Sequence, residues 1–208
     1  MRRSYDNIAW FYDRLARLVY GKALIHAQQY LIAAIPQGAT ILIAGGGTGW
    51  ILEELAALHP FGLTIIYIDI STGMIALAKK RNVADNKITF INSAIQTVVL
   101  SEEYDAVLTP FLFDNFSEQT SAAAFSNIHD HLKENGLWLF ADFQLAENKK
   151  LWQKLLLKVM YAFFRITCGI ETSHLPDTKK YFSEYHYQLV AEKVLLKKFI
   201  VARIFRKA

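Results

Sequence analysis

The chain has 208 residues, of which 53% are hydrophobic and 20% charged, a globular composition that excludes a disordered or fibrous protein. Its single cysteine, Cys168, excludes an internal disulfide, so we expect a reducing, cytoplasmic compartment. The basic start of the chain is followed by no apolar core, and no apolar run reaches the length of a membrane span. We therefore expect neither a secretory signal nor a transmembrane helix.

Charge is distributed unevenly along the chain. Residues 1–146 contain 10 basic and 14 acidic side chains, whereas residues 147–208 contain 13 basic and 5 acidic ones. Such a basic region is typical of a solvated lysine-rich face or of a surface for an anionic partner, and we favour the solvated face. No arginine-rich tract or aromatic-basic repeat indicates nucleic acid as a partner.

Helices and strands are predicted to alternate through most of the chain. Apolar runs bounded by turn residues predict strands at residues 40–44, 63–68, 88–91, 106–108 and 137–140, the last one after a turn at Asn135-Gly136. Amphipathic spacing predicts helices at residues 5–34, with a break near Gly21, and at 50–58, 74–81 and 117–132. This alternation is typical of βαβ units and a parallel sheet.

The C-terminal segment departs from this alternation. Residues 187–196 and 199–205 are both rich in β-forming side chains, and only Lys197-Lys198 join them. A link this short cannot cross over to make a parallel pair, so we expect an antiparallel hairpin. The predicted fold is α/β: a doubly wound, mostly parallel, Rossmann-like sheet with a C-terminal antiparallel hairpin.

A glycine-rich bend joins the first predicted strand to the next helix. It contains Gly45, Gly46, Gly47 and Gly49. Glycine lets the backbone approach a ligand closely, and the helix N-terminus adds positive potential. Trp50 stands where a P-loop would have lysine and where a dinucleotide fingerprint would have glycine, so neither pattern is complete.

Asp69 closes the second predicted strand, 20 residues after Gly49. The carboxyl ends of neighbouring parallel strands meet at one edge of a sheet, so we expect Asp69 beside the glycine bend. Its two carboxylate oxygens match the two hydroxyls of a ribose. The alternative is a helix N-cap, since Asp69 or Ser71 precedes a predicted helix. Together with the bend, ribose binding is favoured.

Five segments follow one another in the order and spacing of one enzyme family: ILIAGGGTG, DISTGMIALAKK, FINSAIQT, YDAVLTPFLFDNF and LKENGLWLFADF. Over about residues 40–143 the chain resembles the class I S-adenosylmethionine-dependent methyltransferases. Near the N-terminus, YDNIAWFYDRL resembles the lead of small-molecule methyltransferases of ubiquinone and menaquinone biosynthesis. The resemblance implies seven strands, S-adenosylmethionine as cofactor, and in-line methyl transfer to a small, partly hydrophobic molecule.

The resemblance also implies one methyltransferase-like domain over residues 1–208. It divides into a helical lead (1–38), a cofactor-binding core (39–143), a helical lid or substrate segment (144–184) and a terminal hairpin (185–208). The family's cofactor-binding positions correspond to Tyr12, Gly45, Gly46, Gly47, Gly49, Asp69, Ile70, Met74, Ser93, Ala94, Thr109 and Pro110. Tyr12 would cover the methionine end, Asp69 would bind the ribose, and Thr109 would face the methyl donor.

Two positions depart from the family's pattern. Ile43 stands where the family usually has an acid for the ammonium end of the cofactor, and Ser93 replaces the usual adenine-side acid. These departures leave open a catalytically inactive, methyltransferase-like binding module. A nicotinamide-dependent oxidoreductase is a further alternative, against which Trp50 argues.

No catalytic signature stands out. The methyl group is already activated on a sulfonium, so positioning can supply most of the catalysis. The candidate bases are Tyr12, His26, Asp114 and His174. For Asp114 a helix cap near Asn115 or Ser117 is slightly favoured, and for His174 an exposed loop position. No Cys/His spacing indicates a metal.

Residues 151–167 predict a helix with a wide apolar face and a stripe formed by Lys154, Lys158 and Arg165. The apolar face fits a lid over an apolar substrate, or peripheral contact with a membrane whose anionic headgroups meet the lysines. A buried helix with one wet stripe is the third interpretation. We favour the buried helix or the lid over membrane contact, and leave the oligomeric state open.

Overall fold

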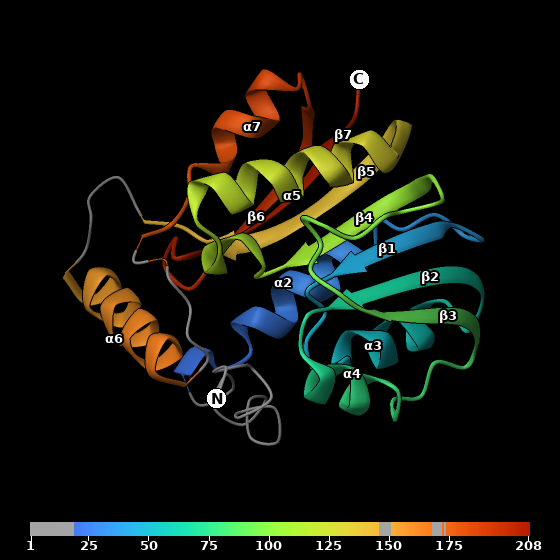
Figure 1. The fold of residues 1–208 in the computed structure, drawn as a ribbon, viewed down its shortest axis with the longest axis horizontal. Coiled ribbons are helices and arrows are strands. Elements are labelled where there is room, and N and C mark those ends of the chain that lie inside the picture. Colours follow the sequence, from blue (N-terminus) through green and yellow to red (C-terminus); the bar gives the residue numbers. More distant parts are fainter. Residues whose placement is uncertain (1–18, 146–150, 168–171, 173) are drawn as a thin grey trace.

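The computed structural model describes residues 19–145, 151–167, 172 and 174–208. These residues build one seven-stranded sheet with the order β3-β2-β1-β4-β5-β7-β6 (Figure 1). The strands are β1 (Thr40–Ala44), β2 (Phe61–Asp69), β3 (Asp85–Asn92), β4 (Tyr104–Pro110), β5 (Leu132–Phe143), β6 (Gln188–Leu195) and β7 (Ile200–Arg206). The helices are α2 (Ala23–Ile32), α3 (Trp50–Leu58), α4 (Thr72–Ala78), the 3₁₀ turn η2 (Phe113–Asn115), α5 (Glu118–His131), α6 (Leu151–Thr167) and α7 (Thr178–Glu184).

Strand direction follows the predicted pattern. Strands β1 to β5 pair in parallel, and β7 pairs antiparallel with both β5 and β6. The α/β fold class and the C-terminal hairpin are therefore confirmed. From β1 the chain moves outward to β2 and β3, then returns to place β4 on the other side of β1. This reversal of strand order creates a crevice at the carboxyl ends of β1 and β4.

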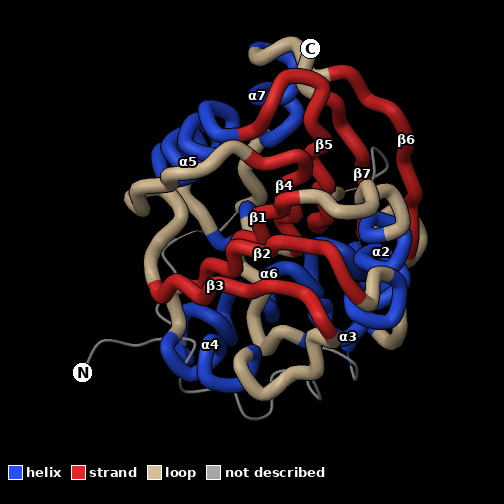
Figure 2. The backbone as a smooth tube through the Cα atoms, turned by 90° about the vertical axis from the view of Figure 1, so that its right-hand side faces the viewer, coloured by secondary structure: helices blue, strands red, loops and turns tan. Residues whose placement is uncertain are grey.

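Alternate residues of the inner strands pack into two separate apolar layers. Ile41 and Ile43 belong to the layer that also contains residues of α2, α3, α4 and α6, whereas Leu42 and Ala44 belong to the layer with α5 and α7. Figure 2 shows α5 on one side of the sheet and α3 and α4 on the other. Successive strand side chains point to opposite faces, so a strand covered by helices on both sides must be apolar throughout. The continuous run Ile41–Ala44 meets this requirement.

Several predicted boundaries change in the structure. The break near Gly21 is confirmed, since Gly21 lies in a turn with φ of +58°. The expected helix before residue 19 lies outside the described residues. The prediction that a turn at Asn135-Gly136 precedes the fifth strand was wrong: β5 begins at Leu132 and includes both residues. Its register with β4 shifts between Tyr104 and Ala106, and Asn135 has φ of +62°, so the turn-forming pair is accommodated as an irregularity within the strand.

Helix α6 forms as predicted, but the interpretation as a buried helix was wrong. One side of it is buried against the body, through Gln153, Leu157, Met160 and Tyr161. On the other side, large apolar side chains remain exposed, at fractions from 58% for Val159 to 83% for Leu151. No helix in the described ranges combines the length and apolarity needed to cross a bilayer.

An aromatic cluster around Phe182 ties α7 to the sheet. Its ring stacks on Phe205 at 3.8 Å between centroids and meets Trp138 edge-on at 5.2 Å. Because Phe182 is only 3% exposed, we expect Phe182→Ala to lower the free energy of unfolding by about 3–5 kcal/mol in urea titrations. The matched control Phe61→Ala removes a ring that is 59% exposed and should cost far less. Equal losses in the two variants would contradict this packing.

Candidate active site

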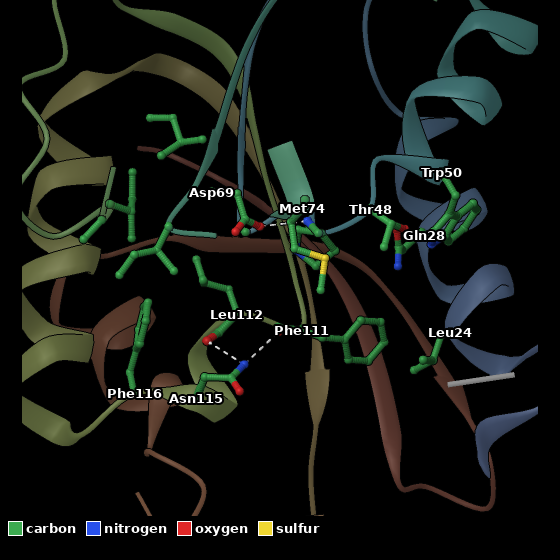
Figure 3. Close-up of a pocket in the computed structure, with 18 of the residues that line it drawn as sticks. Leu24, Gln28, Thr48, Trp50, Asp69, Met74, Phe111, Leu112, Asn115 and Phe116 are labelled. Carbon is green, nitrogen blue, oxygen red and sulfur yellow. Dashed lines mark hydrogen bonds between the residues drawn. The ribbon is translucent and has the colours of Figure 1, made fainter. Parts of the chain in front are cut away.

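A pocket opens at the carboxyl ends of β1, β2 and β4, where the strand order reverses (Figure 3). The glycine bend after β1, Asp69 at the end of β2 and the loop after β4 line it, together with residues from α2 and from the loop after β3. Sites of doubly wound folds lie at this switch point because the loops there diverge and leave a crevice. The topology therefore brings the bend and Asp69 together, as the sequence predicted.

Hydrogen bonds hold the glycine bend on both sides. The backbone N–H of Gly47 donates to Asp69 Oδ2 at 2.9 Å, and Tyr67 Oη donates to the Gly47 carbonyl at 3.0 Å. Arg81 Nε donates to the carbonyl of Thr48 at 3.0 Å. Gly47 has φ of +64°, and a Cβ there would meet open space, so bare backbone faces the pocket. The bend is thus oriented before any ligand arrives.

Asp69 is oriented by the same contacts. Its Oδ1 accepts the backbone N–H of Ser71 at 2.9 Å, and Ser71 caps α4 by accepting the N–H of Met74 at 3.1 Å. Ser71 therefore performs the capping role that was the alternative for Asp69. The Asp69 side chain is 9% exposed and lines the pocket.

Most of the predicted cofactor positions line this one pocket. They are Gly45, Gly46, Gly47, Asp69, Ile70, Met74, Ser93, Ala94 and Pro110. Met74 is buried, whereas Ile70 is 64% exposed and forms the rim. Ile43 is fully buried in the core, so its side chain does not reach the site. Their contacts with a ligand stay a prediction.

Two predicted cofactor positions within the described residues, Thr109 and Gly49, do not line the pocket. Thr109 is fully buried and accepts a hydrogen bond from Trp138 Nε1 at 3.0 Å, because its side chain points into the sheet layer rather than out of the loop. Gly49 is the N-cap of α3 with φ of +76°, and a Cβ there would lie 2.6 Å from Ala78 Cβ, so this glycine serves helix packing. Tyr12 lies outside the described residues.

The three candidate bases that the structure describes, His26, Asp114 and His174, do not line the pocket either. Asp114 is 4% exposed within η2 and does not cap α5, whose N-cap is Ser117. His174 lies in an exposed loop, with Nε2 3.9 Å from Glu118 Oε1. His26 is exposed on α2. The described ranges also contain no cluster of three or more His, Cys, Asp or Glu side chains that could hold a metal ion.

Asp114 belongs to a buried acidic pair that the sequence analysis missed. Asp142 Oδ2 accepts the backbone N–H of Asp114 at 3.2 Å, and both side chains are 4% exposed. Burial raises the pKa of Asp142 to about 7; burial and the charge of Asp142 raise the pKa of Asp114 well above its ordinary value. Burial and these two acids also raise the pKa of Tyr161 on α6. Two adjacent buried carboxyls cannot both ionise at low cost, so at least one of the two stays protonated near neutral pH.

The pocket also contains polar and aromatic residues that were not predicted as cofactor contacts. Gln28 on α2, Trp50 at the start of α3 and Asn115 after β4 all line it. Gln28 is 6% exposed and occupies the same helix face as Leu24 and Leu31, which is the one signal that the sequence offered. Asn115, which lines the pocket, is the sequence neighbour of the predicted base Asp114. Its Nδ2 donates to Asp114 Oδ1 at 2.8 Å.

Comparison with known protein sequences finds similarity to a methyltransferase domain and to two curated enzymes. Residues 41–136 match the family model described as a methyltransferase domain. The malonyl-[acyl-carrier protein] O-methyltransferase of Priestia megaterium is 27% identical over 143 residues, which cover 69% of this chain and 51% of that protein. The carboxy-S-adenosyl-L-methionine synthase of Nautilia profundicola is 32% identical over 129 residues, 59% of this chain and 52% of that protein. The chain therefore spans about half the length of these curated relatives.

Solved structures share the fold. A chain from a Haloferax volcanii complex with the Trm112 methyltransferase activator superposes with a TM-score of 0.71 at 14% identity, covering 100% of this chain and 99% of that one. The 1,6-didemethyltoxoflavin-N1-methyltransferase of Burkholderia thailandensis gives 0.66 at 13% identity, over 98% and 86% of the two chains. Residues 41–136 thus match a methyltransferase domain, and the sheet order and the glycine-bend pocket give the chain the same resemblance to the class I S-adenosylmethionine-dependent methyltransferases that its motifs carry.

Proposed function

We propose that this protein binds S-adenosylmethionine in the pocket above β1 and transfers its methyl group to a small, partly hydrophobic molecule. The observation that carries the proposal is the Gly47–Asp69 hydrogen bond, which sets a carboxylate beside open backbone at the pocket wall. A carboxylate can accept hydrogen bonds from both hydroxyls of a ribose. The Burkholderia thailandensis neighbour, solved with S-adenosylhomocysteine, supports the same choice of cofactor.

The charge of the pocket fits this cofactor. Asp69 is the one charged side chain among the described residues that line it. S-adenosylmethionine carries a sulfonium and an ammonium against one carboxylate, so a net positive ligand meets a negative wall. Ile70, Met74 and Ile95 offer apolar contacts for a planar base near Asp69.

Gln28 is proposed to bind the amino-acid end of the cofactor, where Ile43 provides no acid. Figure 3 shows Gln28 beside Thr48 and Trp50, on the side of the pocket away from Asp69. Within the part of the chain that the structure describes, the Gln28 amide makes no hydrogen bond, and its atoms are not enclosed, so they remain accessible at the pocket wall. A ligand that replaces water on such an amide gains about 0.5–1.5 kcal/mol for each hydrogen bond. Because an amide both donates and accepts, it suits a group with an ammonium and a carboxylate.

The remaining wall suits a partly apolar methyl acceptor. Phe111, Leu112 and Phe116 contribute apolar surface after β4, and Asn115 contributes an amide. Since no lysine or arginine lines the pocket in the described ranges, a neutral acceptor fits better than a phosphate or carboxylate.

The proposed mechanism rests on positioning. When bound, the cofactor supplies a methyl group already activated on a positively charged sulfur, so an aligned acceptor matters more than a strong base. Asp69, Gln28 and the glycine bend orient the donor, and the residues after β4 orient the acceptor. Asp114 and Asp142 are buried and do not belong to the described pocket lining, so we assign them a structural role. Tyr12 stays a proposed cover for the methionine end.

A catalytically inactive binding module is the second candidate, and Ile43 in place of the usual acid favours it. Such a module would bind the cofactor without turnover. Transfer of a labelled methyl group from S-adenosylmethionine to any member of a metabolite panel would exclude it, because a module without catalysis labels none.

Substitution of Asp69 tests the cofactor site. We expect Asp69→Ala to weaken S-adenosylmethionine binding by about tenfold or more in titration calorimetry, because charge-assisted hydrogen bonds contribute about 1.5–3 kcal/mol each. Asp69→Asn retains one acceptor oxygen, so its affinity for S-adenosylmethionine should lie between those of the wild type and Asp69→Ala. The control Asp85→Asn removes an exposed acid at the start of β3 and should leave affinity unchanged. Absence of binding by the wild type would refute the proposed cofactor.

Substitution of Gln28 separates binding from folding. Gln28→Leu removes the amide and keeps an apolar side chain of similar size. We expect S-adenosylmethionine affinity to fall by about tenfold, while the free energy of unfolding without ligand does not decrease, because no described hydrogen bond is lost. A loss of stability with unchanged affinity would mean that Gln28 is a structural residue.

The acidic pair predicts a pH dependence of stability. A carboxyl whose pKa rises from 3.8 to about 7 on folding binds its proton more tightly in the folded state, so the stability it contributes is lost as pH rises through 7. From about pH 6 to about pH 8 the free energy of unfolding should fall by on the order of 1 kcal/mol. In urea titrations, the free energy of unfolding of Asp142→Asn should depend less on pH than that of the wild type. The control Asp85→Asn should keep the pH dependence of the wild type. A wild type whose stability rises over this range would disprove the shift.

A further inference from the structure

Helix α6 stands at one side of the molecule and is anchored to it along one side only (Figure 1). Gln153 Nε2 donates to the carbonyl of Lys197 at 3.1 Å, Trp152 packs edge-on against Phe199 at 5.5 Å, and Met160 Sδ accepts the hydroxyl of Tyr20 at 3.1 Å. These contacts fix the helix orientation and therefore determine which of its side chains face outward.

The outward side of α6 is apolar. Leu151, Leu155, Val159 and Ile166 are separated by four, four and seven residues, so they lie on one helix face. Their exposed fractions are 83%, 64%, 58% and 68%. A contiguous exposed row of large aliphatic side chains is unfavourable in water and marks an interaction surface.

A basic stripe borders this apolar face. Lys154, Lys158 and Arg165 follow one another at spacings of four and seven residues, between the outward apolar face and the buried one. The helix contains no acidic residue, and two more exposed lysines, Lys197 and Lys198, lie in the loop that Gln153 contacts. The surface thus combines apolar side chains with positive charge.

Three kinds of occupant can be compared on this basis. A lid over the pocket is disfavoured, because no α6 residue belongs to the described pocket lining. A second copy of the chain would bring another α6 without acids against the first, and like charges oppose that contact. An anionic bilayer complements both features, since aliphatic side chains enter the acyl boundary while lysines reach the headgroups.

We propose that α6 docks this protein on an anionic lipid surface, with the helix lying in the plane of the interface. Leu155 and Val159 insert at the boundary of the acyl chains, and Lys154 and Lys158 pair with anionic headgroups. Amphipathic helices with a polar face rich in lysine bind lipid in this orientation without crossing it. The proposal needs no bound cofactor, so it stands or fails independently of the proposed methyl transfer.

Co-sedimentation of the full chain with lipid vesicles tests the proposal. We expect binding to vesicles of phosphatidylcholine mixed with phosphatidylglycerol, weaker binding to phosphatidylcholine alone, and release as salt is raised. The charge variant K154E/K158E and the apolar variant L155S/V159S should each bind about tenfold or more weakly. Circular dichroism melts establish that the variants are folded.

Matched controls change the same residue types elsewhere. Lys87→Glu alters an exposed lysine on β3, and Val99→Ser alters a valine that is 89% exposed, so both should bind vesicles as the wild type does. Equal binding by the α6 variants and these controls would overturn the proposal, as would a wild type that does not sediment. A dimer in light scattering that L155S/V159S dissociates would overturn it too, because a second copy would then cover the face.

Discussion

The hydrogen bond from the Gly47 N–H to Asp69 Oδ2 joins the carboxyl ends of two neighbouring strands, β1 and β2, at the pocket. It connects the bend after β1 to the last residue of β2, and the second oxygen of the same carboxylate reaches the N–H of Ser71 at the start of α4. One side chain therefore sets the position of the bend, the strand end and the following helix. A site built this way is already arranged before its ligand arrives, which lowers the ordering cost of binding.

In the proposed function, Gln28 compensates for the departure from the family pattern at Ile43. Ile43 lies on the face of β1 that packs against α2 and α3, where an ionised side chain would be costly. Gln28 enters the pocket from the neighbouring helix, on the side away from Asp69. In the function proposed above, this neutral amide takes over the role of a strand acid without placing a charge in the core.

Two parts of the molecule keep polar or apolar groups where folding alone would not favour them. The acidic pair of Asp114 and Asp142 is buried beside the loop after β4, and the raised pKa of Asp114 keeps one carboxyl neutral, which lowers the cost of burial. Helix α6 leaves aliphatic side chains in water next to a lysine stripe. The acidic pair fits a rigid loop after β4. The exposed face of α6 fits the lipid surface that we propose covers it.

The sequence by itself determined the fold class, the position of the pocket at the switch point and many of the residues that line it. These follow from local patterns: apolar runs such as Ile41–Ala44, glycines at a strand-to-helix bend, and an acid closing the next strand. Only the tertiary structure decided that Thr109 points into the sheet, that Asn115 rather than Asp114 reaches the wall, and that Asp142 meets Asp114 from a distant strand. It also decided which side of α6 is covered, because periodicity shows that a helix has an apolar face but not what packs against it.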